Sequence, residues 1–117
     1  MAELAGVALV TGGAGFIGSH LVDRLLSLPQ IRKVIVLDDF SAGRMENLQH
    51  HLGNPRFKLV KGSITDRTLV KDLLREVDYV FHEAAIVSVE LSTRKPIQVN
   101  RVNVEGSLTL LEAALRA

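Results

Sequence analysis

An apolar run leads directly into a glycine-rich loop in residues 7–18, which read Val7-Ala8-Leu9-Val10-Thr11-Gly12-Gly13-Ala14-Gly15-Phe16-Ile17-Gly18. The apolar run is typical of a buried strand, and a helical pattern begins after the loop. Positions 13, 15 and 18 form G-x-G-x-x-G, and positions 12, 15 and 18 form G-x-x-G-x-x-G. Between a strand and a helix, such glycines allow a tight turn and a close approach of the backbone to a pyrophosphate. We predict a phosphate-binding loop, with a glycine-rich turn that binds nothing as the alternative.

An acidic residue follows the second apolar run at the distance that a dinucleotide site requires. Asp38 lies 20 positions after Gly18, where a carboxylate can accept a hydrogen bond from the adenosine ribose 2′-hydroxyl. Asp39 follows directly, and two carboxylates would repel a 2′-phosphate, whose charge is about −2. We therefore predict NAD in preference to NADP, a preference that the nearby Arg44 would soften. The alternative for Asp38 is a turn-forming acid at a strand end.

Apolar runs alternate with helical patterns along the whole chain. We expect strands at 7–10, 34–37, 57–60 and 79–81, and helices at 16–28, 66–76 and 97–116, with a weaker helical pattern at 44–52. Such alternation indicates a parallel sheet with right-handed crossovers. The first two strands are apolar at every position, which is typical of a sheet covered by helices on both faces. The sequence predicts one α/β domain over residues 1–117.

Composition excludes several classes of protein. The 117 residues contain 47% apolar and 23% charged residues, no Cys, and a net charge of +1. Without Cys there are no disulfides, thiolate metal sites or cysteine nucleophiles. The small net charge argues against nucleic-acid and membrane-surface partners. No apolar run reaches the ~18 residues of a membrane span, and the first residues lack the basic start of a secretory signal, so we expect a cytoplasmic protein.

Two more segments follow the third and fourth predicted strands. They read Gly62-Ser63-Ile64-Thr65-Asp66 and His82-Glu83-Ala84-Ala85-Ile86-Val87-Ser88. Both fall at the carboxyl ends of strands, where ligands of open α/β sheets bind. We interpret His82 as a structural residue rather than an acid–base group. We interpret His50-His51 as a solvated helix face without the spacing of a metal-ligand set, and we predict no metal site and no catalytic residue.

Together these segments resemble the extended short-chain dehydrogenase/reductase family, especially its NAD-dependent nucleotide-sugar epimerases and dehydratases. The resemblance rests on residues 11–21, 37–41, 62–66, 82–85, 103–107 and 110–114. The UDP-glucose 4-epimerase branch is the most similar, and the 3β-hydroxysteroid dehydrogenase branch shares much of the pattern. The resemblance implies a Rossmann-like sheet of order 3-2-1-4, here ending after the fourth strand and its helix.

The resemblance also implies a set of cofactor contacts. Phe16 and Ile17 would direct backbone N–H groups at the pyrophosphate, and Asn103 would lie in the helix below the nicotinamide. The full set of implied cofactor-binding residues is Gly12, Gly15, Phe16, Ile17 and Gly18 in the loop, Asp38, Asp39, Phe40, Ser41 and Gly43 at the ribose, Ser63 and Ile64 at adenine, and Ala84, Ala85 and Val87 near the nicotinamide-side ribose.

The chain departs from the family pattern in two respects. The family usually has Asp where this chain has Ser63. Its chemistry uses a Tyr-x-x-x-Lys pair with a Ser or Thr, all downstream of the Asn103 helix, whereas the single tyrosine here is Tyr79, within a predicted strand. We therefore expect an NAD-binding N-terminal part that lacks the catalytic pair and the substrate lobe and is inactive alone. The alternatives are a non-enzymatic nucleotide-binding or regulatory module, a self-associating structural remnant, and a half-enzyme completed by another chain.

Self-association is a further expectation from the chain's length. If the sheet ends at the fourth strand, that strand is an apolar, unpaired edge, and such edges tend to find a partner. The last predicted helix would likewise leave an apolar patch uncovered. We expect a homo-oligomer with the fourth strand or residues 97–117 at the contact.

Overall fold

The computed structural model describes residues 5–83. The helix predicted at 97–116 and residues Ala84, Ala85, Val87 and Asn103 lie outside this range. The elements are β1 (Gly6–Thr11), α1 (Phe16–Leu26), β2 (Ile31–Asp38), the 3₁₀ helices η1 (Met45–Asn47) and η2 (Gln49–His51), β3 (Phe57–Lys61), α2 (Arg67–Leu74) and β4 (Tyr79–His82). In this part of the chain, no helix has the length and apolarity needed to cross a membrane.

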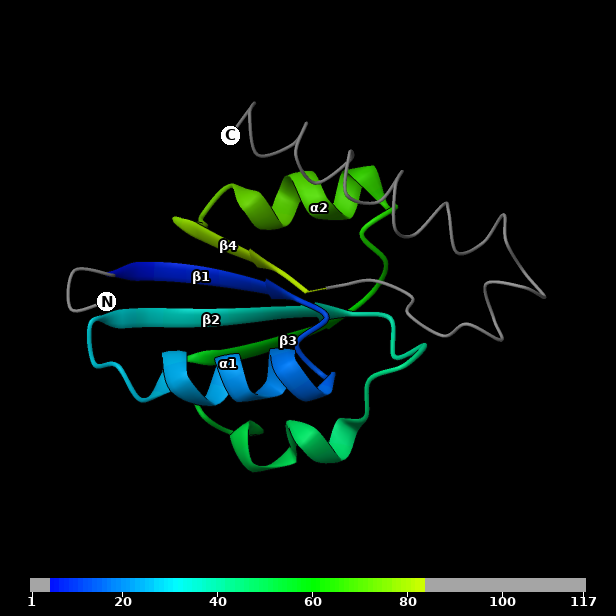
Figure 1. The fold of residues 1–117 in the computed structure, drawn as a ribbon. Helices are drawn as coiled ribbons and strands as arrows, with labels where there is room; N and C mark the ends of the chain where they lie inside the picture. Colours follow the sequence, from blue (N-terminus) through cyan, green and yellow to red (C-terminus); the bar gives the residue numbers. More distant parts are fainter. Residues whose placement is uncertain (1–4, 84–117) are drawn as a thin grey trace.

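The four strands form one parallel sheet in the order β3-β2-β1-β4, as Figure 1 shows. This confirms the Rossmann-like order 3-2-1-4. The chain moves from β1 outward to β2 and β3, then returns past β1 to form β4. The direction of winding therefore reverses at β1, which is where open α/β sheets bind ligands. Thr11 pairs with Leu37 on one side and with His82 on the other, so three strand ends lie level at the same edge.

Helices cover both faces of the sheet, as predicted. In Figure 1, α1 and the 3₁₀ segment lie below the sheet and α2 lies above it. Because successive strand residues point to opposite faces, β1 contributes to two cores. The core under α1 contains Ala8, Val10, Val22, Leu25, Leu26, Val34, Val36 and Leu48. The core under α2 contains Val7, Leu9, Ile35, Leu37, Ile64, Val70, Leu73 and Leu74.

The helix predicted at 44–52 is wrong, because the segment forms the two short 3₁₀ helices instead. Fewer than ten residues separate Gly43 from Gly53, whose φ is +93°, and so short an α-helix has little intrinsic stability. Tertiary contacts determine its shape instead. Leu48 is fully buried in the core under α1, and the Asn47 side-chain amide donates to the Ala14 carbonyl at 2.8 Å.

Arg56 fixes the connection between α1 and β2. Its guanidinium donates to the carbonyl oxygens of Leu26 at 2.9 Å, of Leu28 at 2.8 Å and of Ile31 at 2.6 Å. The last carbonyls of a helix have no partner within the helix, and a guanidinium satisfies them with charge-assisted hydrogen bonds. This helps to explain why α1 ends at Leu26 rather than at the predicted position 28, and why β2 begins at Ile31 rather than at 34.

Candidate functional site

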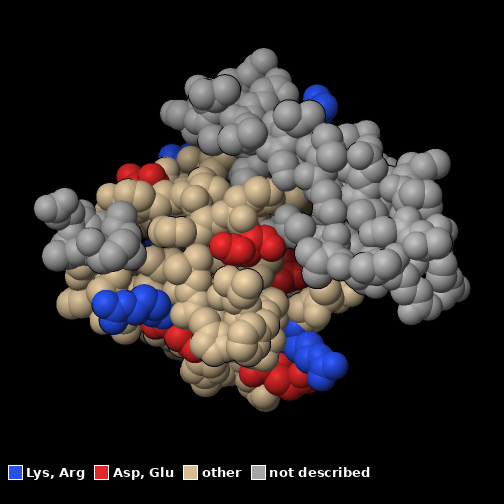
Figure 2. Space-filling view, viewed as in Figure 1, with Lys and Arg blue, Asp and Glu red and all other residues tan. Residues whose placement is uncertain are grey.

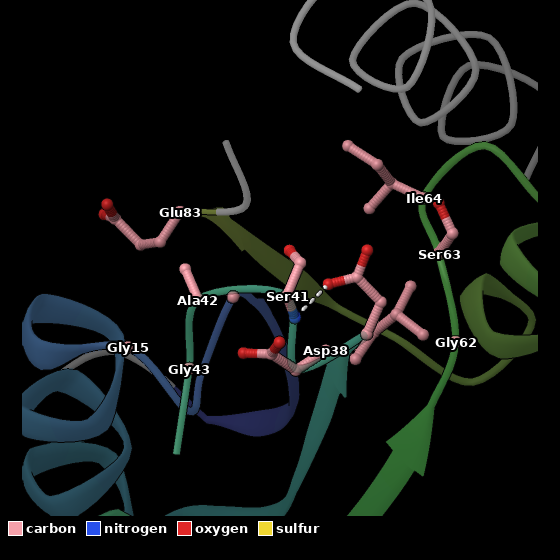
Figure 3. A pocket seen from close by; sticks show the side chains of 12 residues that line it. Gly15, Asp38, Ser41, Ala42, Gly43, Gly62, Ser63, Ile64 and Glu83 are labelled. Carbon is pink, nitrogen blue, oxygen red and sulfur yellow. Dashed lines mark hydrogen bonds between the residues drawn. The ribbon is translucent and has the colours of Figure 1, made fainter. Parts of the chain in front are cut away.

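A pocket lies at the carboxyl ends of the strands, where the winding of the sheet reverses. In Figure 3, Asp38 stands between Gly15 and Gly43 on one side and Ser63 and Ile64 on the other. The lining residues are Gly12, Gly15, Leu37, Asp38, Asp39, Ser41, Ala42, Gly43, Gly62, Ser63, Ile64 and Glu83.

The structure brings most of the sequence-predicted site residues together. Eight of them line the pocket: Gly12, Gly15, Asp38, Asp39, Ser41, Gly43, Ser63 and Ile64. Phe40 lines a neighbouring hollow instead. Phe16 and Ile17 begin α1 and are 78% and 66% exposed, and Gly18 is buried in the same helix.

The fold itself explains three of the loop glycines. Gly12 has a φ of +71°, which L side chains rarely adopt. A Cβ on Gly13 would lie 2.7 Å and 2.8 Å from the two methyl carbons of Val36. A Cβ on Gly18 would collide with the Gly12 carbonyl, because the helix begins directly against the loop. These three positions are therefore restricted whether or not a ligand binds.

Gly15 differs from the other loop glycines. It is the N-cap of α1, with a φ of −76° that any residue adopts, and it offers no side-chain cap. Among residues 5–83, a Cβ there would meet the Gly12 carbonyl oxygen alone, at an ordinary 3.4 Å. This part of the chain gives no reason for a missing side chain at Gly15, whereas a phosphate beside the N–H groups of the first turn would.

Asp38 holds the pocket together from the end of β2. It is 7% exposed. Its Oδ2 accepts from the backbone N–H of Ala14 at 2.9 Å, and its Oδ1 accepts from the N–H of Phe40 at 2.7 Å. A carboxylate offers about four lone-pair positions, so it retains capacity to accept from a ribose hydroxyl. Phe40 has the left-handed φ of 61°, and the hydrogen bond to Asp38 stabilises this uncommon conformation.

The segment after β2 docks onto the glycine loop. A Cβ on Gly43 would lie 2.7 Å from the Ala14 Cβ and 2.9 Å from Oδ2 of Asp38, so only glycine fits there without a shift. The Ala14 carbonyl accepts from the Arg44 backbone N–H at 3.0 Å and from the Asn47 side chain. Sequence analysis missed Asn47, because no local pattern links it to a loop more than thirty residues earlier.

The loop after β3 forms the opposite wall of the pocket. The Ser63 hydroxyl lies 2.8 Å from the Thr65 hydroxyl and accepts from the Thr65 backbone N–H at 3.1 Å. Ile64 is 3% exposed and belongs to the core under α2. Asp66 caps α2 by accepting from the Leu69 N–H at 3.1 Å. This wall is therefore held in place by its own turn and by the core behind it.

The end of β4 supplies two polar residues. Nδ1 of His82 lies 2.6 Å from the Thr11 hydroxyl, and the Glu83 N–H donates to the Thr11 carbonyl at 3.0 Å. Burial lowers the pKa of His82 below 6.5, against the opposing effect of the Glu83 charge. A neutral, half-buried His82 agrees with the structural role inferred from sequence. Glu83 lines the pocket and was not assigned there from sequence.

The pocket is acidic. Three carboxylates line it, those of Asp38, Asp39 and Glu83, and none of its described lining residues is Lys or Arg. Figure 2 shows acidic and basic side chains interspersed on the described part of the visible face. Arg44 and Lys61 line a neighbouring hollow. Among the described residues, the groups that could bind an anionic ligand in the pocket are therefore backbone N–H groups rather than side-chain cations.

Comparison with known sequences identifies a family. The sequence model of the GDP-mannose 4,6 dehydratase family matches residues 9–117. UDP-glucuronic acid decarboxylase 4 of Arabidopsis thaliana is 42% identical over 92% of this chain and 23% of its own length. UDP-glucose 4-epimerase of Mycolicibacterium smegmatis is 47% identical over 91% of this chain and 34% of its own length.

Solved structures lead to the same family. The dTDP-glucose 4,6-dehydratase of Streptomyces venezuelae, in a complex containing NAD, superposes with a TM-score of 0.88 at 42% identity, over 95% of this chain and 36% of that one. The UDP-glucose 4-epimerase of Thermus thermophilus, in complex with NAD, gives a TM-score of 0.79 at 38% identity, over 94% and 34%.

The chain is thus an α/β protein with a Rossmann-like sheet, of the epimerase/dehydratase type. It belongs to the GDP-mannose 4,6-dehydratase family and corresponds to the family's N-terminal Rossmann region. This confirms the resemblance found from sequence, including the similarity to UDP-glucose 4-epimerases. The chain spans about a quarter to a third of the length of these relatives.

Proposed function

We propose that residues 5–83 bind the adenosine and pyrophosphate parts of NAD in the pocket at the strand ends. The observation that carries this proposal is Gly15. Its missing side chain has no cause in the described part of the fold, yet it leaves the first turn of α1 open to a phosphate. The partial positive charge at a helix N-terminus favours an anion there.

The remaining pocket residues fit the other parts of the ligand. Asp38 is held by two backbone N–H groups and would accept from the adenosine ribose. Ser63 and Ile64 would flank adenine across the pocket, and Ala84, Ala85 and Val87 are proposed at the nicotinamide-side ribose. Two of the relatives compared above are structures that contain NAD. When bound, NAD supplies a hydride acceptor, and the described residues bind and orient its adenosine half.

We further propose that the site prefers NAD to NADP. Asp38 and Asp39 line the pocket next to each other, and none of the described lining residues is a cation. A 2′-phosphate would bring about two negative charges towards these carboxylates. Arg44 and Lys61 line the neighbouring hollow rather than the pocket, so their compensation would be partial.

The Gly15→Ala variant tests the nucleotide site. Of the atoms in residues 5–83, the added methyl group approaches the Gly12 carbonyl oxygen alone, at 3.4 Å, so we expect a change in the free energy of unfolding below about 1 kcal/mol. NAD affinity should fall by about tenfold or more, because the methyl group would occupy the phosphate position. Unchanged NAD affinity in this folded variant would contradict the proposal.

Catalysis by this chain alone is not part of the proposal. Tyr79 lies in β4, and the residue four positions later is Glu83, so this tyrosine does not begin a Tyr-x-x-x-Lys pair. We propose that nucleotide-sugar epimerisation or dehydration would need residues beyond those described, within a longer protein or in another chain. Activity that appears only after mixing with a C-terminal family fragment would support the half-enzyme. Its absence, with NAD still bound, would favour a binding module.

Self-association stays a proposal for this chain. Within residues 5–83, β4 pairs only with β1, and Val80 on it is 37% exposed. An apolar edge of this kind favours pairing with a second copy. The cytoplasmic location and the lack of nucleic-acid and membrane partners also stay predictions from composition. Sedimentation of a single monomeric species at about 100 µM would contradict the oligomer.

A further inference from the structure

Three side chains with metal-ligating atoms converge on the outer side of α1, away from the pocket. Asp23 lies in α1, and His50 and His51 end η2. Their ligand atoms lie within 4.8 Å of one another. The sequence shows no third donor at metal-ligand spacing from the histidine pair, and the structure brings one close in space. The third donor, Asp23, is 27 residues from His50 in sequence and reaches it only because the 3₁₀ segment docks beside α1.

We propose that Asp23, His50 and His51 form a binding site for a divalent transition-metal ion of the zinc class. Two imidazole nitrogens and one carboxylate oxygen are ligands that suit Zn²⁺, Co²⁺ and Ni²⁺. The hard ions Mg²⁺ and Ca²⁺ prefer sets made of oxygen alone, so they should bind much more weakly. The proposal does not depend on the nucleotide site.

The two imidazole rings both direct a nitrogen at the same carboxylate oxygen of Asp23. Nε2 of His50 lies 2.9 Å from Oδ1 of Asp23, and Nε2 of His51 lies 2.5 Å from the same oxygen. In a tetrahedral site with bonds of 2.0–2.1 Å, ligand atoms stand about 3.3 Å apart. Each of these two nitrogen–oxygen distances would therefore increase by less than about 1 Å to admit an ion. The side chains of Asp23 and His50 are 47% and 57% exposed, which gives them room to move and gives water access to the remaining positions.

His51 is the preorganised ligand of the three. Its side chain is 12% exposed. Its ring centroid lies 3.9 Å from that of His50 and 5.6 Å from that of Phe57, the first residue of β3. The neighbouring Leu48 is fully buried in the core and anchors the segment. A ligand that is already held by packing loses little conformational freedom when it binds.

A metal ion binds the ionised form of a carboxylate and the neutral form of an imidazole ring. Binding at this cluster should therefore weaken in acid, where both kinds of ligand take up protons. A bound ion would join α1 to the segment that carries Asn47, whose side chain contacts the glycine loop.

Calorimetric titration of Zn²⁺ into the tag-free full chain at neutral pH tests the proposal. We expect one saturable site, with affinity at least about tenfold lower in Asp23→Asn and in His51→Gln. Zn²⁺ should also raise the melting temperature of the native chain, because it binds only the folded state, and should not raise that of Asp23→Asn. Mg²⁺ serves as the comparison ion and should give no saturable heat.

The chain's four histidines provide the control. His20 lies on the same helix as Asp23 but contacts Phe16 instead, so His20→Gln should bind Zn²⁺ as the native chain does. If far-UV circular dichroism shows that His51→Gln fails to fold, the affinity of His50→Gln for Zn²⁺ is measured instead, because His50 is exposed and its replacement should leave the fold intact. The absence of saturable Zn²⁺ binding would overturn the proposal. So would binding that survives Asp23→Asn and His50→Gln, or binding that is lost equally in His20→Gln.

Discussion

Replacing Asp38 with Asn tests the residue that holds the pocket wall in place and that we propose to bind the adenosine ribose. The carboxylate is 7% exposed and accepts hydrogen bonds from the N–H groups of Ala14 and Phe40. Asn keeps one oxygen but places an amide N–H₂ against the second backbone N–H. One charged hydrogen bond is lost and one buried donor is left without an acceptor, which corresponds to about 1.5–3 kcal/mol of the free energy of unfolding.

Asp39→Asn is the matched control for this substitution. Asp39 is the next residue and carries the same charge, but it is exposed, and within residues 5–83 its side chain accepts from the Ser41 N–H alone, at 2.9 Å. Urea denaturation should show a loss below about 0.5 kcal/mol for Asp39→Asn. In calorimetry, Asp38→Asn should also bind NAD at least about tenfold more weakly. Equal losses of stability in the two variants would refute the reasoning, because they would mean that the buried backbone contacts of Asp38 contribute nothing.

Three further predictions follow from the contacts and charges described. Arg56→Lys keeps the positive charge but removes the guanidinium group that binds three carbonyl oxygens, so we expect urea denaturation to show a loss of about 2–3 kcal/mol in the free energy of unfolding. Arg75→Lys, at a side chain that is 73% exposed, should lose almost nothing, and equal losses in the two variants would contradict the role of Arg56. Burial lowers the pKa of His82 in the folded state below 6.5, so as the pH falls the unfolded chain takes up a proton before the folded chain does. The free energy of unfolding should therefore decrease below about pH 6.5, and a His82→Gln variant with the same pH dependence would exclude His82 as the cause. ADP-ribose should bind about as well as NAD, because the described pocket residues are proposed to bind the adenosine half. A nicotinamide contribution above about 1.4 kcal/mol, tenfold in affinity, would argue against that.

The fold was predictable because its signals are local. The glycine loop, the apolar run before it and Asp38 at a fixed spacing each reflect a requirement of one strand–loop–helix unit. The same features located most of the pocket, since parallel strands end at one edge. Gly12, Gly15, Asp38 and Ser63 line it as predicted, whereas their role as cofactor ligands stays a prediction.

The features that were missed depend on contacts between segments far apart in the chain. Asn47 contacts Ala14 and His51 contacts Asp23 only because the segment at 45–51 docks on α1. Its periodicity suggested a helix, but the buried Leu48 and the flanking glycines favour 3₁₀ turns. Arg56 likewise binds carbonyls that precede it by 25 to 30 residues. No local pattern encodes these pairings, so sequence reasoning without a structure had no means to find them.

Calorimetric titration of NAD and of NADP into the purified chain tests the central claim most directly. We predict one saturable NAD site and NADP affinity at least about tenfold lower, because Asp38 and Asp39 line the pocket side by side. Failure of a demonstrably folded chain to bind either nucleotide would show that the glycine loop serves only the architecture of the sheet. Equal affinity for the two nucleotides would contradict the role assigned to the paired carboxylates.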